Sequence, residues 1–184
     1  MPGEVTLLLN RYHAGEAAAF DTLAKLLYPE LKAMARRRAS NQGDMGATVL
    51  VNETFAKLLS DGRLDTQDRH QFFRLAATVM RQLVVDEMRY ISAQKRSADE
   101  VTYADAEVPD DTSAKAEFVL EVNGMLERLA ERDERLTSVF ECRYFAGYST
   151  SETAEVLDLS DRTVERLWAS AREQIADWMG DSNR

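Results

Sequence analysis

Residues 149 to 172, STSETAEVLDLSDRTVERLWASAR, constrain the possible fold more than any other part of the chain. Ser149 is followed three residues later by Glu152, which forms a capping box and marks the start of an α-helix. Residues 158 to 160 (DLS) interrupt the apolar pattern, and a second helix begins at Asp161. The segment therefore predicts two helices joined by a turn of three residues.

The second helix, which Ser160 can cap, has two distinct faces. An apolar stripe that can pack on the first helix is formed by Val164, Trp168, Ala171 and Ile175. The opposite side carries Arg162, Arg166 and Arg172. A short helix, a tight turn and a longer helix with outward arginines are typical of a helix-turn-helix, whose second helix enters the DNA major groove. The alternative is an ordinary helical hairpin with a solvated arginine face.

The composition of this 184-residue chain is that of a globular protein, with 45% hydrophobic and 30% charged residues. No apolar run approaches the ~20 residues that a membrane span requires, and the N-terminus lacks a charged-then-apolar signal pattern. The single cysteine, Cys142, cannot form a disulfide within the chain. We therefore expect a cytoplasmic protein that does not insert into a membrane.

The net charge of −9 is unevenly distributed along the chain. Residues 1–97 carry 14 Lys/Arg against 11 Asp/Glu, whereas residues 98–118 carry 1 against 7 and residues 119–184 carry 8 against 14. Proteins that bind DNA unaided usually gain much of their affinity by neutralising phosphates. A chain with this acidic balance is poorly equipped to bind DNA tightly by itself.

Periodic apolar residues predict helices over residues 5–13, 16–40, 47–59 and 71–93. Pro29 implies a kink or a boundary within the second of these helices. The apolar face of that helix consists of Phe20, Leu23, Leu27, Leu31 and Met34.

Two of these helices carry polar faces that are candidates for binding. The outward residues of the helix over 47–59 are Asn52, Glu53 and Lys57. The polar residues that lie away from the core of the helix over 71–93, or follow it, are Arg81, Gln82, Arg89, Lys95 and Arg96. These residues could form an ordinary solvated face, but their basic bias indicates a surface for the nucleic-acid backbone.

Residues 98–113 are rich in small and acidic residues, include Pro109 and have no helical period, so we expect a flexible linker there. It divides the chain into a helical domain over residues 1–97 and a four-helix domain over residues 114–184. The second domain begins with an apolar register of Phe118, Val122, Met125, Leu126 and Leu129, and another helix starts near Asp133. Because no stretch shows β-alternation, the expected fold class is all-α.

The sequence offers no set of catalytic or metal-binding residues. His13 and His70 lie far apart, and neither a metal-binding nor a phosphate-binding motif occurs. Cys142 stands among apolar neighbours, as a small core residue would. We therefore expect a protein that is not an enzyme and uses no metal or cofactor.

Taken together, the two halves resemble bacterial RNA polymerase sigma factors of the extracytoplasmic-function (ECF) class. RYFAGYSTSETAEVLDLSDRTVERLWASARE is similar to the promoter-reading helix-turn-helix of that family, and LERLAERDERLTSVFE to the helices that support it. TVLVNETFAKLL resembles its polymerase-binding helix, and HQFFRLAATVMRQLVVDEMRYISAQKR resembles the helix that opens the upstream promoter element. The resemblance covers nearly all of the chain.

The resemblance implies a subunit that binds core RNA polymerase and directs it to promoter DNA. It assigns polymerase binding to Asn52, Glu53 and Lys57. It assigns the minus-ten element to the loop over residues 60–69 and to Arg81, Gln82, Arg89, Lys95 and Arg96. It assigns the minus-thirty-five element to Ser160, Arg162, Thr163, Glu165, Arg166 and Arg172. Bound polymerase would then supply much of the DNA affinity, and an inhibitory anti-sigma protein is a further partner that the family implies.

The chain departs from the family pattern at three positions. Asp158 stands where many relatives have glycine, and Asn52 where glutamine or histidine is frequent. Glu165 replaces a common lysine, so this side chain repels phosphate or accepts a hydrogen bond from cytosine. The competing interpretation is a helix-turn-helix regulator that works without polymerase and uses its first domain to sense a signal or to dimerise. Such a regulator would bind its operator without core enzyme.

Overall fold

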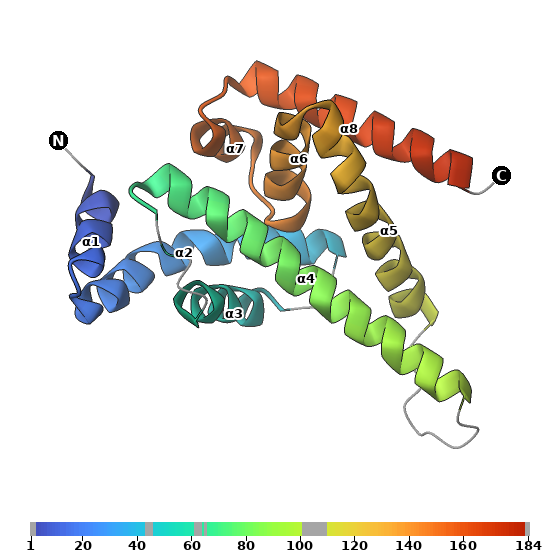
Figure 1. The fold of residues 1–184 in the computed structure, drawn as a ribbon, viewed down its shortest axis with the longest axis horizontal. Helices are drawn as coiled ribbons and strands as arrows, with labels where there is room; N and C mark the ends of the chain where they lie inside the picture. Colours follow the sequence, from blue (N-terminus) through green and yellow to red (C-terminus); the bar gives the residue numbers. More distant parts are fainter. Residues whose placement is uncertain (1–2, 43–45, 61–63, 65, 101–109, 183–184) are drawn as a thin grey trace.

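The computed structural model of the protein describes residues 3–42, 46–60, 64, 66–100 and 110–182. Within these ranges the chain is all-α, as predicted, and contains no β-strand. The elements are α1 (Glu4–His13), α2 (Ala17–Gln42), α3 (Ala47–Ser60), α4 (Arg69–Glu100), α5 (Asp110–Arg132), α6 (Glu134–Phe140), the π-helical turn η1 (Glu141–Phe145), α7 (Thr150–Leu157) and α8 (Asp161–Ser182) (Figure 1). None of the helices described is long and apolar enough to cross a membrane.

Helices α1 and α3 pack against α2, α4 packs against α3, and the apolar face of α2 lies in the resulting core. All five residues of the expected stripe are buried: Phe20, Leu23, Leu27, Leu31 and Met34. Helix α2 continues through Pro29 to Gln42, so the proline does not form a helix boundary. Helices α3 and α4 close this core with Leu50, Phe55 and Phe72.

The segment expected as a linker is helical at both of its ends. Helix α4 continues to Glu100 and α5 begins at Asp110, whereas the linker was expected over residues 98–113. Acidic residues favour the N-terminus of a helix because they interact with its dipole, so the acidity of residues 110 and 111 suits the first turn of α5. Residues 101–109 lie outside the described part of the chain.

Helices α5 to α8 form the second group of helices. Val122, Met125, Leu126 and Leu129 are buried as expected, but Phe118 is 45% exposed. The buried face of α5 includes Val119, one residue further along and therefore turned by about 100° from Phe118. The apolar pattern identified the helix but assigned Phe118 to the wrong face.

The two groups of helices pack directly against each other across α4. Figure 1 shows α4 crossing the middle of the molecule, with α3 on one side of it and α6 to α8 on the other, while α2 passes behind α4. Helix α4 contacts α3 and also contacts α5, η1 and α7, and one apolar core includes residues of both groups. The division of the chain into domains over residues 1–97 and 114–184 stays a prediction.

Candidate nucleic-acid and polymerase interfaces

Local hydrogen bonds fix the two helices and the turn that the sequence predicted. The Ser149 Oγ accepts from the Glu152 N–H at 3.2 Å, and the Glu152 carboxylate accepts from the Ser149 N–H at 2.7 Å, which completes the capping box. Burial alone would raise the pKa of Glu152, but these bonds to Ser149 and the Arg37 guanidinium outweigh burial and lower the pKa. Helix α7 is thus held at its first turn by an ionised carboxylate.

The turn between α7 and α8 depends on a left-handed residue. Asp158 has φ 52° and ψ 51° and ends α7, and the N–H of Leu159 then donates to the Ala154 carbonyl at 2.9 Å. The Ser160 Oγ accepts from the Thr163 N–H at 3.2 Å and so caps α8. Both features agree with the roles expected for Asp158 and Ser160 from the sequence.

The buried face of α8 differs from the expected stripe at one position. The residues of α8 that are buried are Val164, Leu167, Ala171, Ile175 and Trp178. Trp168, which was expected among them, is only partly buried and lies 5.3 Å from the Phe140 ring, measured between centroids. Leu167 and Trp168 lie three and four residues after Val164, so helical spacing alone is compatible with either residue in the core.

The exposed residues at the start of α8 form the candidate minus-thirty-five surface. Ser160, Arg162, Glu165 and Arg166 are exposed, and the hydroxyl of the half-buried Thr163 lies 2.8 Å from that of Ser160. Arg162 and Arg166 follow each other at one helical turn, with Glu165 beside them. Among these five residues, two are cations and one is an anion.

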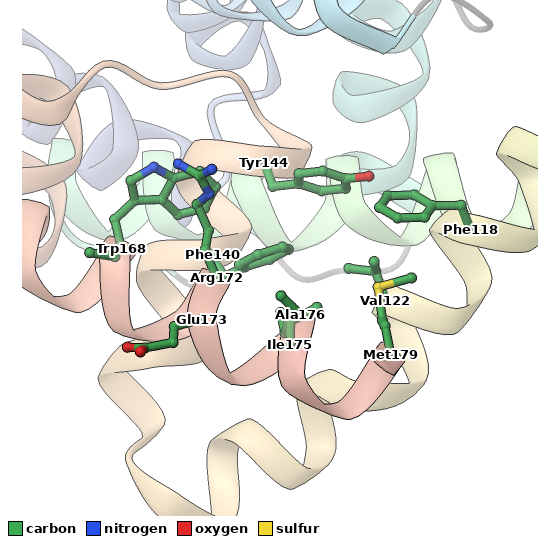
Figure 2. Close-up of a pocket in the computed structure, with 11 residues that line it drawn as sticks. Phe118, Val122, Phe140, Tyr144, Trp168, Arg172, Glu173, Ile175, Ala176 and Met179 are labelled. Atoms are coloured by element: carbon green, nitrogen blue, oxygen red, sulfur yellow. The ribbon is translucent and has the colours of Figure 1, made fainter. Parts of the chain in front are cut away.

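Arg172 lies at the edge of the side of α8 that carries Arg162 and Arg166. It lies six positions after Arg166, which corresponds to a rotation of about 120° around the helix. Its guanidinium lies 5.6 Å from the centre of the Trp168 ring, and Arg143 approaches the same ring at 5.6 Å. Figure 2 shows Arg172 beside Trp168 at one end of a groove of about 700 Å³, with Phe118 at the other end. The assignment of Arg172 to the minus-thirty-five surface stays a prediction, and its guanidinium also contacts Trp168.

The candidate minus-ten residues share one side of α4. Helical geometry places Arg81, Gln82, Arg89, Lys95 and Arg96 within a sector of roughly 140°. Arg89 and Arg96 are exposed, whereas Gln82 and Lys95 are half-buried. The loop over residues 60–69 belongs to the same prediction, and its positions 61–63 and 65 lie outside the described residues.

Arg81 is engaged by the second group of helices. Its Nε donates to the Asn123 Oδ1 at 2.9 Å, and its Nη1 donates to the Glu141 Oε1 at 2.5 Å. The side chains of Arg81 and Glu141 are only 22% and 13% exposed. Arg81 was expected on an open basic face, and no sequence pattern indicated that Glu141, sixty residues away, would cover it.

The candidate polymerase-binding face lies on α3. Asn52 and Glu53 are exposed as expected, and Val49, one turn earlier, is an apolar side chain that is 52% exposed. Lys57 is half-buried, and its Nζ lies 3.7 Å from Asp86 of α4, so it also connects α3 to α4. Val49 was missed from the sequence, although its spacing of three and four residues from Asn52 and Glu53 places it on their face.

Cys142 lies in the core of the second group of helices. It is 1% exposed, and burial raises the pKa of its thiol to about 12. His13 and His70 stand in separate places: the His13 Nε2 lies 2.6 Å from the Leu64 carbonyl oxygen, and the His70 Nε2 lies 3.7 Å from a Glu155 oxygen. A protonated, inaccessible thiol fits the structural role expected for Cys142.

Comparison with known protein families agrees with this arrangement of helices. The family model described as ECF sigma factor matches residues 2–181. No match was found among curated proteins. Because the family match runs from the first helix to the last, the protein belongs to the ECF sigma factors.

Proposed function

We propose that the protein binds core RNA polymerase and directs it to a specific set of promoters. The observation that carries the proposal is the family match over residues 2–181, which includes both the α3 face and the α7–α8 pair. The proposed place of action is the cytoplasm, where polymerase and chromosomal DNA are found in bacteria. An inhibitory anti-sigma protein is a second proposed partner, in keeping with the family.

The α3 face suits a protein partner better than DNA. It presents an exposed apolar side chain, Val49, next to the amide of Asn52 and the carboxylate of Glu53. A carboxylate repels phosphate, whereas protein interfaces combine apolar contacts with a few polar groups. We assign this face to the polymerase.

The exposed start of α8 suits the DNA major groove. Arg166 can donate two hydrogen bonds to guanine, and Glu165 can accept from the amino group of cytosine. Only two arginines stand on this surface, so few phosphates can be neutralised there. Tight binding to the minus-thirty-five element therefore requires that the polymerase hold the protein next to the DNA.

The minus-ten element is assigned to the basic side of α4. Arg89 and Arg96 are exposed, so they can reach phosphates in the structure as it stands. Arg81 and Gln82 line a polar groove of about 430 Å³ between α3, α4 and α5. Arg81 can reach a phosphate only if its contacts with Asn123 and Glu141 break.

Binding to core polymerase tests the proposal. The double replacement Asn52→Ala and Glu53→Ala should weaken binding to core polymerase at least tenfold, while the free energy of unfolding changes by less than ~0.5 kcal/mol because both side chains are exposed. Asn10→Ala combined with Glu121→Ala is a matched control, since it removes one exposed amide and one exposed carboxylate elsewhere.

Two results would count against the assignment. Equal affinity of the double variant and the parent would remove the α3 face from the interface. If the parent does not bind core polymerase but binds its own promoter DNA tightly, the protein is a regulator that works without polymerase.

A further inference from the structure

The groove of about 700 Å³ beside Trp168 lies between α5, the α6–η1 segment and α8. Part of its wall belongs to the core, since Val122, Phe140 and Ile175 are 1%, 3% and 5% exposed. Another part is Phe118, an aromatic side chain that is 45% exposed to solvent. Small-molecule sites in proteins have volumes of roughly 300–1,000 Å³ and mostly apolar walls. The groove therefore has the size and the surface of a ligand site.

The groove is elongated and has one basic end. Figure 2 shows Arg172 and Trp168 at this end, and Met179 near Phe118 at the other. Because Met179 lies eleven positions after Trp168 on α8, the groove extends ~16 Å along this helix. A ligand that fills the groove is therefore long and apolar, with its polar group at the Arg172 end.

Arg172 provides a cation that is available to a ligand. Its side chain is exposed, and in the described part of the chain no carboxylate forms an ion pair with it. Arg143 approaches the same Trp168 ring but has other partners. Its Nη1 donates to the Tyr148 carbonyl at 3.3 Å and to the Thr150 hydroxyl at 3.1 Å. Arg143 is thus held by protein acceptors, and its charge adds to the positive potential at this end of the groove.

Glu173 also lines the groove, and its side chain is exposed. Figure 2 shows its carboxylate directed away from Tyr144 and Phe118. Water and salt screen the repulsion between exposed charges. Glu173 therefore opposes an anion at Arg172 only weakly.

We propose that this groove binds an elongated amphiphilic carboxylate, whose charged group contacts Arg172 and whose apolar chain lies between α5 and α8. A guanidinium can donate two parallel hydrogen bonds to a carboxylate. The apolar chain covers Phe118 and Met179, and removal of apolar surface from water stabilises the complex. The inference goes beyond the proposed function and does not depend on it, because it concerns ligand binding by the free protein.

An apolar segment of a protein partner is the other occupant that such a groove can accept. A segment of that kind needs only the apolar walls, whereas a carboxylate also needs Arg172. Ligands that share one alkyl chain and differ in charge therefore distinguish the two occupants.

Isothermal titration calorimetry of the full-length protein with such ligands tests the proposal. The probes are decanoate, uncharged 1-decanol and cationic decyltrimethylammonium, each below the concentration at which it aggregates. Decanoate should bind about tenfold tighter than 1-decanol, because its carboxylate gains charge-assisted hydrogen bonds. The net charge of −9 attracts the cationic probe non-specifically, so a preference for decanoate cannot arise from net charge.

Two variants locate the bound probe. Ala176→Phe places a ring in the groove and should abolish decanoate binding, whereas Ala130→Phe, at an exposed position of α5 outside the groove, should not. Arg172→Gln should weaken decanoate binding about tenfold and leave 1-decanol binding unchanged. Its matched control, Arg36→Gln, removes an exposed guanidinium from α2 and should change neither. All four positions are exposed, so these variants should fold as the parent does.

Loss of decanoate binding in Ala176→Phe and its weakening in Arg172→Gln would support the proposal. An absence of decanoate binding, or an affinity that neither variant changes, would overturn it. Equal affinities for decanoate and 1-decanol would assign the groove to an apolar partner instead, and tighter binding of decyltrimethylammonium would assign it to cations. If Ala176→Phe does not fold, as judged by circular dichroism, Arg172→Gln decides by the same titrations.

Discussion

Replacing Leu167 with alanine should destabilise the protein strongly, although the expected apolar stripe contained its neighbour Trp168 instead. Leu167 is 3% exposed and faces the core formed with α6, whereas Arg166 beside it is exposed. Truncation of a buried leucine removes its transfer free energy and leaves a cavity, at a cost of ~2–5 kcal/mol. Arg166→Ala is the adjacent control and should change the free energy of unfolding by less than ~0.5 kcal/mol.

Thermal unfolding, monitored by circular dichroism, compares the Tm values of the parent, Leu167→Ala and Arg166→Ala. For a chain of this size each kcal/mol corresponds to roughly 2–4 °C in Tm, so Leu167→Ala should lower Tm by at least ~4 °C. A decrease of less than 2 °C for Leu167→Ala would show that Leu167 is not packed as the structure describes. The register of α8, and with it the assignment of Arg162 and Arg166 to the outer face, would then be wrong.

Two further predictions concern α7. Asp158→Gly should raise the free energy of unfolding by up to ~1 kcal/mol, because glycine adopts the left-handed conformation at φ 52° without steric cost. Chemical denaturation measures this difference. A lower free energy of unfolding for Asp158→Gly would show that the Asp158 side chain stabilises the protein by more than its left-handed backbone conformation destabilises it. The pKa of Glu152 is lowered in the folded protein, so its stabilising contribution is present above the pKa of an ordinary glutamate, ~4.3, and is lost as the pH falls below it. The free energy of unfolding, measured with urea, should therefore differ less between pH 7 and pH ~3.5 in Glu152→Gln than in the parent. An equal difference in both proteins would show that the ionised Glu152 carboxylate does not stabilise the fold.

Local patterns in the sequence were sufficient to predict most helix positions. The capping box at Ser149 and Glu152 is present, and Asp158 and Ser160 end and start helices as expected. These features depend on residues within a few positions of one another, and their hydrogen bonds follow from short-range geometry. The apolar stripe of α2 was likewise recovered, because five residues at helical spacing define one face without ambiguity.

Features that depend on distant parts of the chain were not recovered. Trp168 and Leu167 both satisfy the spacing to Val164, and only the position of the neighbouring helices decides which of them is buried. The engagement of Arg81 by Glu141 joins residues sixty positions apart, so no local pattern could indicate it. Most of the candidate residues are exposed as expected, and the sequence failed to predict that Arg81 would be covered.

Transcription in a purified system tests the central claim most directly. Core RNA polymerase from the same cell, freed of its other sigma factors, is incubated with genomic DNA with and without the protein, and the 5′ ends of the transcripts are mapped. The sigma-factor assignment predicts new start sites that depend on the protein, share a pair of upstream elements and disappear with the Asn52→Ala and Glu53→Ala double variant. An identical set of start sites with and without the protein, at concentrations that saturate the polymerase, would contradict it.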